Sequence, residues 1–108
     1  MARGAGTASA TVTLRYSVYV RKAAERDIAD AQKWYEDQQR GLAAEFHDEF
    51  NATIDRLTET PLIYPTIYCN VRRAVLHRFP YLVWYRVQST LVTVIACTHA
   101  KADPGKAS

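Results

Sequence analysis

Residues 72–87 have the sequence RRAVLHRFPYLVWYRV, and this stretch decides the architecture of the C-terminal half of the chain. β-Branched, aromatic and basic residues predominate from Val71 to Phe79, which is typical of a β-strand. Pro80 follows and cannot donate a hydrogen bond to a neighbouring strand, so it marks the end of this strand. From Tyr81 to Val87, apolar residues recur at every second position with large side chains between them, which predicts a central strand covered on both faces.

The sequence after this stretch predicts one more strand. Gln88-Ser89-Thr90 is short enough for a hairpin turn, and Leu91 to Thr98 is an almost continuous apolar run. Strands joined by short connections pair antiparallel, so the three segments predict an antiparallel meander. The final residues, 105–108, show no such pattern and are expected to form a tail.

Two amphipathic helices are predicted upstream of the meander. Helix-forming residues predominate from Ala24 to Gln38, and apolar residues recur at steps of three and four from Leu42 to Leu57. Gly41 is placed for a left-handed cap at the end of the first helix, and Pro61 ends the second, so the two helices form an antiparallel hairpin. The apolar positions expected to face the other helix and the sheet are Ala24, Ile28, Ala31, Trp34 and Tyr35 in the first helix and Leu42, Phe46, Phe50, Ile54 and Leu57 in the second.

Alternating apolar residues from Thr11 to Val20 predict an N-terminal strand with one buried face. Residues 1–10 are mostly small and show no periodicity, so we expect a flexible leader there and a single domain over residues 11–104. The order of elements predicts an α+β fold of two layers. An N-terminal strand and a three-stranded antiparallel meander form one sheet, and the α-helical hairpin packs on one face of it.

The composition excludes several classes of protein. With 108 residues, of which 48% are hydrophobic and 23% charged, the chain has the balance of one globular domain. The net charge of +3 is a mild bias for a protein that would bind a phosphate backbone. No apolar stretch approaches the ~20 residues of a membrane span, and the residues after Arg3 lack the apolar core of a secretory signal, so neither is expected. Two cysteines, Cys69 and Cys97, cannot form a disulfide framework, so free thiols in the cytoplasm are expected.

No motif for a cofactor or a metal is found in the sequence. None of the four glycines lies between a strand and a helix, where a phosphate-binding loop would need it. The three histidines do not belong to a catalytic triad motif. Cys97 and His99 lie on one strand face, and Cys69 and His77 could approach each other, but the chain lacks the paired ligand loops of structural zinc sites. We therefore expect no cofactor and no metal site.

Basic and aromatic residues concentrate on two neighbouring predicted strands. Guanidinium groups interleaved with aromatic rings suit an RNA backbone with stacked bases, or an acidic groove of a protein. An equally weighted alternative is an exposed sheet face whose arginines only keep the protein in solution. Alternation places Arg73 and His77 on one face and Arg72 and Arg78 on the other. The candidate binding residues, two of them at or beyond the end of the last strand, are Arg72, Arg73, His77, Arg78, Tyr81, Trp84, Arg86, His99 and Lys101.

Several phrases of the sequence together resemble the RelE/ParE superfamily of bacterial toxins. They are Ala24-x-x-Asp27-Ile28-x-x-Ala31-x-x-Trp34-Tyr35, Gly41-Leu42-x-x-x-Phe46, Pro61-x-x-Tyr64-Pro65, the stretch 72–87 quoted above, and His99-x-x-x-Asp103-Pro104. The resemblance implies the cytoplasmic toxin of a type II toxin–antitoxin module. Its expected partner is a cognate antitoxin, a small DNA-binding protein encoded by the adjacent gene.

The resemblance implies one of two mechanisms. RelE-like members are similar to ribosome-dependent mRNA endonucleases, and for such an enzyme Arg73 and His99 would be the catalytic candidates. This chain departs from that pattern, because it has Leu82 where those enzymes commonly carry another arginine and no tyrosine after the last strand. The Arg-Phe-Pro-Tyr phrase and the late Asp-Pro are more similar to the ParE-like, plasmid-stabilisation branch.

The first hypothesis is therefore a ParE-like toxin that inhibits bacterial growth by poisoning DNA gyrase through protein–protein contact, without an active site of its own. The alternatives are a RelE-like endonuclease with a reduced catalytic set and a module that has lost toxicity but still binds its antitoxin.

Overall fold

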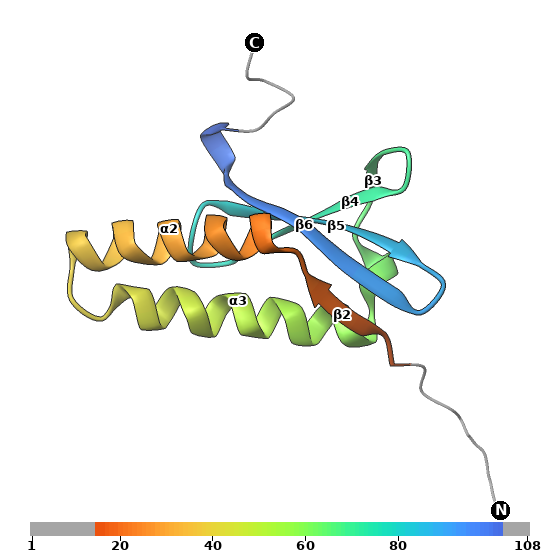
Figure 1. Cartoon of the computed structure of the whole chain (residues 1–108), viewed down its shortest axis with the longest axis horizontal. Coiled ribbons are helices and arrows are strands. Elements are labelled where there is room, and N and C mark those ends of the chain that lie inside the picture. Colours follow the sequence, from red (N-terminus) through yellow and green to blue (C-terminus); the bar gives the residue numbers. More distant parts are fainter. Residues whose placement is uncertain (1–14, 103–108) are drawn as a thin grey trace, which may run out of the picture.

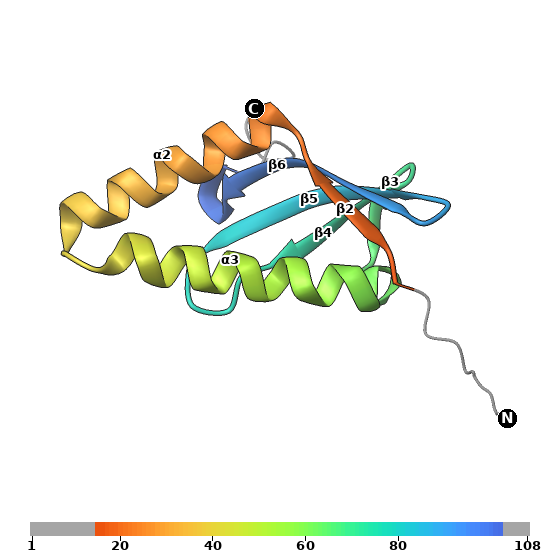
Figure 2. The ribbon, with the colours of Figure 1, turned by 60° about the horizontal axis from the view of Figure 1, so that its bottom comes forward.

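Two helices pack on one face of a five-stranded sheet in the computed structural model, which describes residues 15–102 (Figures 1 and 2). The helices are α2 (Lys22–Gln38) and α3 (Leu42–Glu59). The strands are β2 (Ser17–Val20), β3 (Thr66–Tyr68), β4 (Val71–Val75), β5 (Tyr81–Gln88) and β6 (Leu91–His99). Two 3-10 turns, η1 (Pro61–Ile63) and η2 (Ala100–Ala102), follow α3 and β6. The expected leader over 1–10, the tail over 105–108 and positions 11–14 of the predicted first strand lie outside the described residues.

The sheet has the order β2-β6-β5-β4-β3. The N-terminal strand β2 pairs parallel with the last strand β6, and the remaining pairs are antiparallel. A parallel pair needs a long connection. Here the chain passes from β2 through the helical hairpin and the strands β3, β4 and β5 before it returns as β6 beside β2. The predicted α+β architecture of one sheet with a hairpin on one face is confirmed.

Two details of the sheet differ from the prediction. The segment after the second helix forms a fifth strand, β3, which pairs with β4 across a turn at Cys69 and Asn70. The strand expected to reach Phe79 ends at Val75, and the following residues form a loop. This loop brings Phe79 into the core, where its ring lies 4.8 Å from that of Tyr35 and 5.1 Å from that of Phe46.

The core lies between the hairpin and the sheet, as the helical periodicity predicts. The buried helix residues are Ala24, Ile28 and Ala31 in α2 and Phe46, Phe50, Thr53 and Leu57 in α3. They meet alternate residues of the central strands, among them Val83 and Tyr85 of β5 and Val92 and Val94 of β6. Tyr35 and Ile54 are partly buried against this core, whereas Trp34 is 57% exposed.

The turn between the helices differs from the predicted cap in one respect. Gly41 has φ +94°, the left-handed conformation that its place in the sequence predicts, but it precedes α3 and is not the residue that ends α2. The carboxylate of Glu36 accepts hydrogen bonds from the backbone N–H groups of Gly41 (3.1 Å) and Ala43 (3.0 Å). These bonds lower the pKa of Glu36, because they stabilise its charged form. Glu36 therefore satisfies backbone donors at the start of α3.

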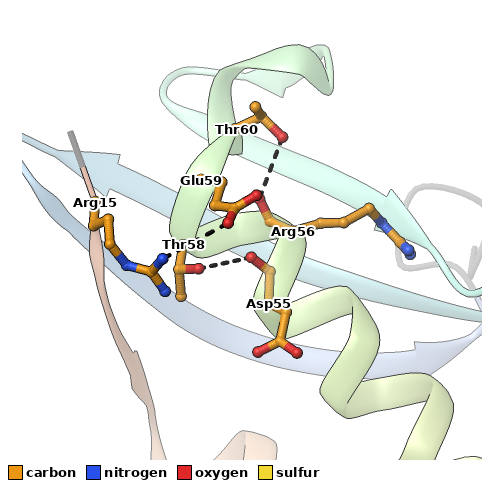
Figure 3. Close-up of polar contacts among 6 residues, drawn as sticks. All are labelled: Arg15, Asp55, Arg56, Thr58, Glu59 and Thr60. Carbon is orange, nitrogen blue, oxygen red and sulfur yellow. Dashed lines mark hydrogen bonds and ion pairs between the residues drawn. The ribbon is translucent and has the colours of Figure 1, made fainter. Parts of the chain in front are cut away.

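The start of β2 lies against the end of α3 (Figure 3). The backbone N–H of Tyr16 donates to the carbonyl of Thr58 (2.8 Å), and Arg15 forms an ion pair with Glu59 (3.7 Å). At the same helix end, the hydroxyls of Thr58 and Thr60 donate to the carbonyls of Asp55 (2.7 Å) and Arg56 (3.3 Å). These bonds close the last turn of α3 and hold it beside the first strand.

Candidate functional site

Three of the predicted residues lie on the face of the sheet that the helices do not cover, here called the open face: Arg73, Trp84 and Arg86. Arg73 and Trp84 are direct partners in the β4–β5 register, and the guanidinium carbon lies 5.6 Å from the indole centroid. The indole N–H donates to the hydroxyl of Thr98 (2.8 Å), which fixes the ring. Arg86, two residues further along β5, has a buried Nε without a hydrogen-bond partner within the described part of the chain.

Three other predicted basic residues hold connections in place. The Arg72 guanidinium donates to the carbonyls of Tyr64 (2.5 Å) and Leu62 (3.3 Å), on the helix side of the sheet. In the β4–β5 loop, the backbone N–H of His77 donates to the carboxylate of Glu49 (2.8 Å), and Arg78 forms an ion pair with Glu45. Both carboxylates belong to α3, so the loop is bound to the hairpin through them.

The predicted residues at the start of β5 and the end of β6 also lie on the helix side. The Tyr81 ring contacts Phe46 at a centroid distance of 5.3 Å and His99 at 5.2 Å. The backbone N–H of Lys101 donates to Nδ1 of His99 (3.0 Å), so the proton of the neutral imidazole is on Nε2. Tyr81 is the direct partner of His99, and Trp84 is the direct partner of Arg73. Because Tyr81 and Trp84 are three positions apart on one strand, they point to opposite faces, and so do His99 and Arg73.

Charge is divided between the two layers. Residues 22–59, which form the hairpin, contain ten Asp and Glu against five Lys and Arg, a net charge of −5. Residues 60–102, which form the strands β3 to β6 and their turns, contain five Lys and Arg and no Asp or Glu. The hairpin is therefore negative and the segment from β3 to η2 is positive, with two of its five cationic side chains, Arg73 and Arg86, on the open face.

Three buried or partly buried titratable groups near these residues have raised pKa values, which favours their neutral forms. Burial, with a smaller effect from the nearby Asp27 carboxylate, raises the pKa of Cys97 to about 12. Burial also raises the pKa of Tyr81 and of Tyr35. A thiol with such a pKa is protonated at neutral pH and is not an activated nucleophile.

Sequence reasoning missed one hollow on the helix side of the sheet. It has a volume of about 360 Å³ and lies between Asp27, Asp30 and Trp34 of α2 and the adjoining ends of β5 and β6. The signal was available, because residues 27, 30, 31 and 34 form one stripe of a helix, but nothing in the sequence showed that β6 would end against it. Within residues 15–102, no group of three His, Cys, Asp or Glu side chains could hold a metal ion, and no helix is long and apolar enough to cross a membrane.

The fold is similar to those of several solved toxin–antitoxin proteins. A chain of the chromosomal ParDE system from P. aeruginosa superposes with a TM-score of 0.70 at 16% identity, covering 79% of this chain and 96% of that one. A chain of the DinJ–YafQ toxin–antitoxin complex from E. coli gives 0.59 at 14% identity, with 84% and 99% covered. A chain of the RelBE2 toxin–antitoxin complex from Mycobacterium tuberculosis gives 0.52 at 19% identity, with 79% and 98% covered.

The sequence itself matches a family. No curated protein matches it significantly. A family model described as the ParE toxin of the type II toxin–antitoxin system, parDE, matches residues 18–104, which include every helix and strand described above apart from Ser17, the first residue of β2. The chain therefore belongs to the ParE family of toxins of type II toxin–antitoxin systems.

Proposed function

We propose that this toxin inhibits bacterial growth by binding DNA gyrase through the open face of its sheet, without cutting RNA, and that a cognate antitoxin neutralises it. The observation that carries the proposal is the placement of Arg73 and His99 on opposite faces of the sheet. Cleavage of a phosphodiester needs a proton acceptor and a cationic group around one phosphate. These two residues do not meet that need together.

The hydrogen bond of His99 supports the same proposal. Its Nδ1 accepts the N–H of Lys101, so this nitrogen is occupied within the chain, and a neutral ring would present the N–H donor at Nε2 to a substrate instead of a proton acceptor. The sequence departures named above, Leu82 in place of an arginine and no tyrosine after the last strand, point in the same direction.

The open face has the chemistry of a protein-binding surface. Arg is enriched among the residues that carry binding energy at interfaces, and here the Arg73 guanidinium lies over the ring of Trp84, which is only 8% exposed and supports it from below. Val75, 49% exposed, adds an apolar contact beside them. The positive charge of this face suits an acidic patch on the target.

The antitoxin is proposed to cover a different surface. The relatives named above come from toxin–antitoxin systems, two of them solved as toxin–antitoxin complexes. In this chain, the segment around β3 contains four of the large exposed apolar residues, and β3 is the edge of the sheet. An extended peptide can pair with such an edge and bury those side chains. The four residues are Leu62, Ile63, Ile67 and Tyr68.

A supercoiling assay with purified gyrase tests the target. We expect the chain to inhibit supercoiling, and His99→Gln to inhibit it equally, because the glutamine oxygen can still accept the Lys101 N–H. Arg86→Gln is expected to weaken inhibition by roughly tenfold or more, the effect of losing an arginine anchor worth about 2 kcal/mol. Lys33→Gln, on the exposed side of α2, is the matched control and is expected to have no effect.

Induction in cells tests the alternatives. Site-specific mRNA cuts that appear on induction and disappear with His99→Gln would replace the gyrase proposal with the endonuclease. Normal growth on induction, with antitoxin binding retained, would show a module that has lost its toxicity.

For the antitoxin, we expect the product of the adjacent gene to co-elute with the chain from a sizing column and to raise its melting temperature by mass action. Separate elution at micromolar concentration would contradict that partner.

A further inference from the structure

The hollow between α2 and the end of β6 has features of a binding site that the proposed gyrase contact does not use. β6 pairs with β2 only as far as Val94, so beyond that point its outer edge faces α2 instead of another strand (Figures 1 and 2). Cys97, 3% exposed, lines the floor, and the polar walls come from Asp27, Asp30 and His99.

Asp27 is held by a backbone hydrogen bond and has no cationic partner in the described part of the chain. Its Oδ2 accepts the backbone N–H of Cys97 at 3.0 Å, which ties the first half of α2 to β6. The residue is only partly exposed, yet no Lys or Arg of residues 15–102 lies within ion-pair distance of it or of Asp30. Asp27 is of intermediate exposure and Asp30 is exposed, so both remain charged without an internal partner. Two carboxylates one helical turn apart thus face a hollow without a counter-charge.

Aromatic rings line the same hollow. Trp34 is 57% exposed and stands edge-on to Tyr35, at a centroid distance of 5.1 Å, which fixes its ring beside the carboxylates. Tyr81 and His99 lie on the opposite wall in edge contact with each other at 5.2 Å. An indole face next to a carboxylate attracts a planar cation in two ways, through the ring quadrupole and through the negative charge.

We propose that this hollow is a subsite for an arginine side chain presented by a partner protein. The guanidinium would lie against Trp34 and donate to Asp30 and to the free oxygen of Asp27. Arginine fits better than lysine because its planar group can stack on the ring and donate to a carboxylate with two parallel N–H groups. The buried Cys97 thiol, protonated at neutral pH, adds no competing charge to the floor.

A titration followed by NMR tests the subsite without any measurement of toxicity, so its result is independent of the proposed target. The nitrogen-15-labelled chain is titrated with acetyl-arginine methylamide, and in parallel with the citrulline analogue, in which a neutral urea replaces the guanidinium. We expect the arginine derivative to shift the backbone signals of Asp27, Cys97 and His99 and the indole signal of Trp34. We expect the citrulline derivative to leave these signals in place.

Substitutions in the hollow show which side chains bind the arginine derivative. Asp30→Asn and Trp34→Ala are each expected to weaken the binding of the arginine derivative by about tenfold, since each removes one of the two attractions. Asp48→Asn, an exposed aspartate on α3, is the matched control and is expected to bind as the unchanged chain does. Equal shifts with both ligands, no shifts with either, or a loss of binding in the Asp48→Asn control as large as that in Asp30→Asn would each overturn the proposal.

Discussion

Tyr85 shows how one side chain can hold two parts of the fold together. It is fully buried in the centre of β5, and its hydroxyl donates to the carbonyl of Pro61 (2.5 Å), the first residue of η1. Arg72, its direct partner on β4, donates to the carbonyl of Tyr64 just after that turn. The return of the chain from α3 to the sheet is therefore fixed by two side chains of neighbouring strands.

Removal of the Tyr85 hydroxyl should be costly for this reason. Tyr85→Phe leaves the Pro61 carbonyl buried without its donor, so we expect a loss of about 1–3 kcal/mol in the free energy of unfolding, measured by urea denaturation. Burial raises the pKa of Tyr85, so the hydroxyl stabilises the fold fully below about pH 10 and less above it, as the unfolded chain ionises first. The difference between the two proteins should therefore shrink above that pH. Tyr68→Phe, at a 65% exposed position, is the control and should change little.

At the scale of elements, the turn between the helices depends on a charge. Glu36 reaches across the turn and accepts the N–H groups that open α3, next to the positive end of the helix dipole. Gly41 makes this geometry possible with its left-handed backbone, and there is open space around the position where a Cβ would lie. The turn therefore combines a conformational requirement with an electrostatic one.

The Glu36 bonds predict a pH-dependent contribution to stability. The pKa of Glu36 is lowered in the folded chain, so its contribution is present above the unfolded value of about 4.3 and is lost as the pH falls through the lower folded value. Glu36→Gln should lower the melting temperature at neutral pH, and the gap to the unchanged chain should close in acid. Asp48→Asn, on the exposed side of α3, should show no such pattern. A gap that stays constant from neutral to acid pH would show that the charge of Glu36 is not what matters.

The elements also show what could be predicted from the sequence. Helical periodicity over seventeen- and eighteen-residue segments predicted α2 and α3 and their buried faces, because many residues repeat one pattern. β3 was missed because it has three residues, all exposed, and so has no pattern of burial. Strand alternation correctly placed Arg72 and Arg73 on opposite faces of the sheet. It could not predict that Arg72 bonds to the Tyr64 carbonyl or that Arg73 lies over Trp84, because these contacts depend on which residues the fold brings near. The hollow at Asp27 joins residues seventy positions apart, a distance at which no local pattern is informative.

At the scale of the whole molecule, the division of charge gives the protein an electric dipole. The hairpin carries a net charge of −5, while all the Asp, Glu, Lys and Arg residues of the segment 60–102 are Lys or Arg. Such asymmetry orients a protein as it approaches a charged partner and speeds productive encounters, and salt weakens the effect. The net charge of +3 conceals this arrangement, because the −5 and +5 of the two segments cancel and the excess comes from residues outside them.

The asymmetry predicts how the toxin should associate with its proposed target. With gyrase immobilised on a sensor surface, the association rate should fall steeply as salt is raised, because the screening length shortens to roughly 8 Å at physiological ionic strength. Arg86→Gln removes a charge from the open face and should lower the rate at low salt by several-fold, with a smaller effect at high salt. Lys33→Gln removes the same charge from the hairpin, where the field is negative, and should leave the rate unchanged or raise it slightly. Equal effects of the two substitutions would mean that the association rate depends only on net charge and that the toxin does not approach gyrase with its open face first.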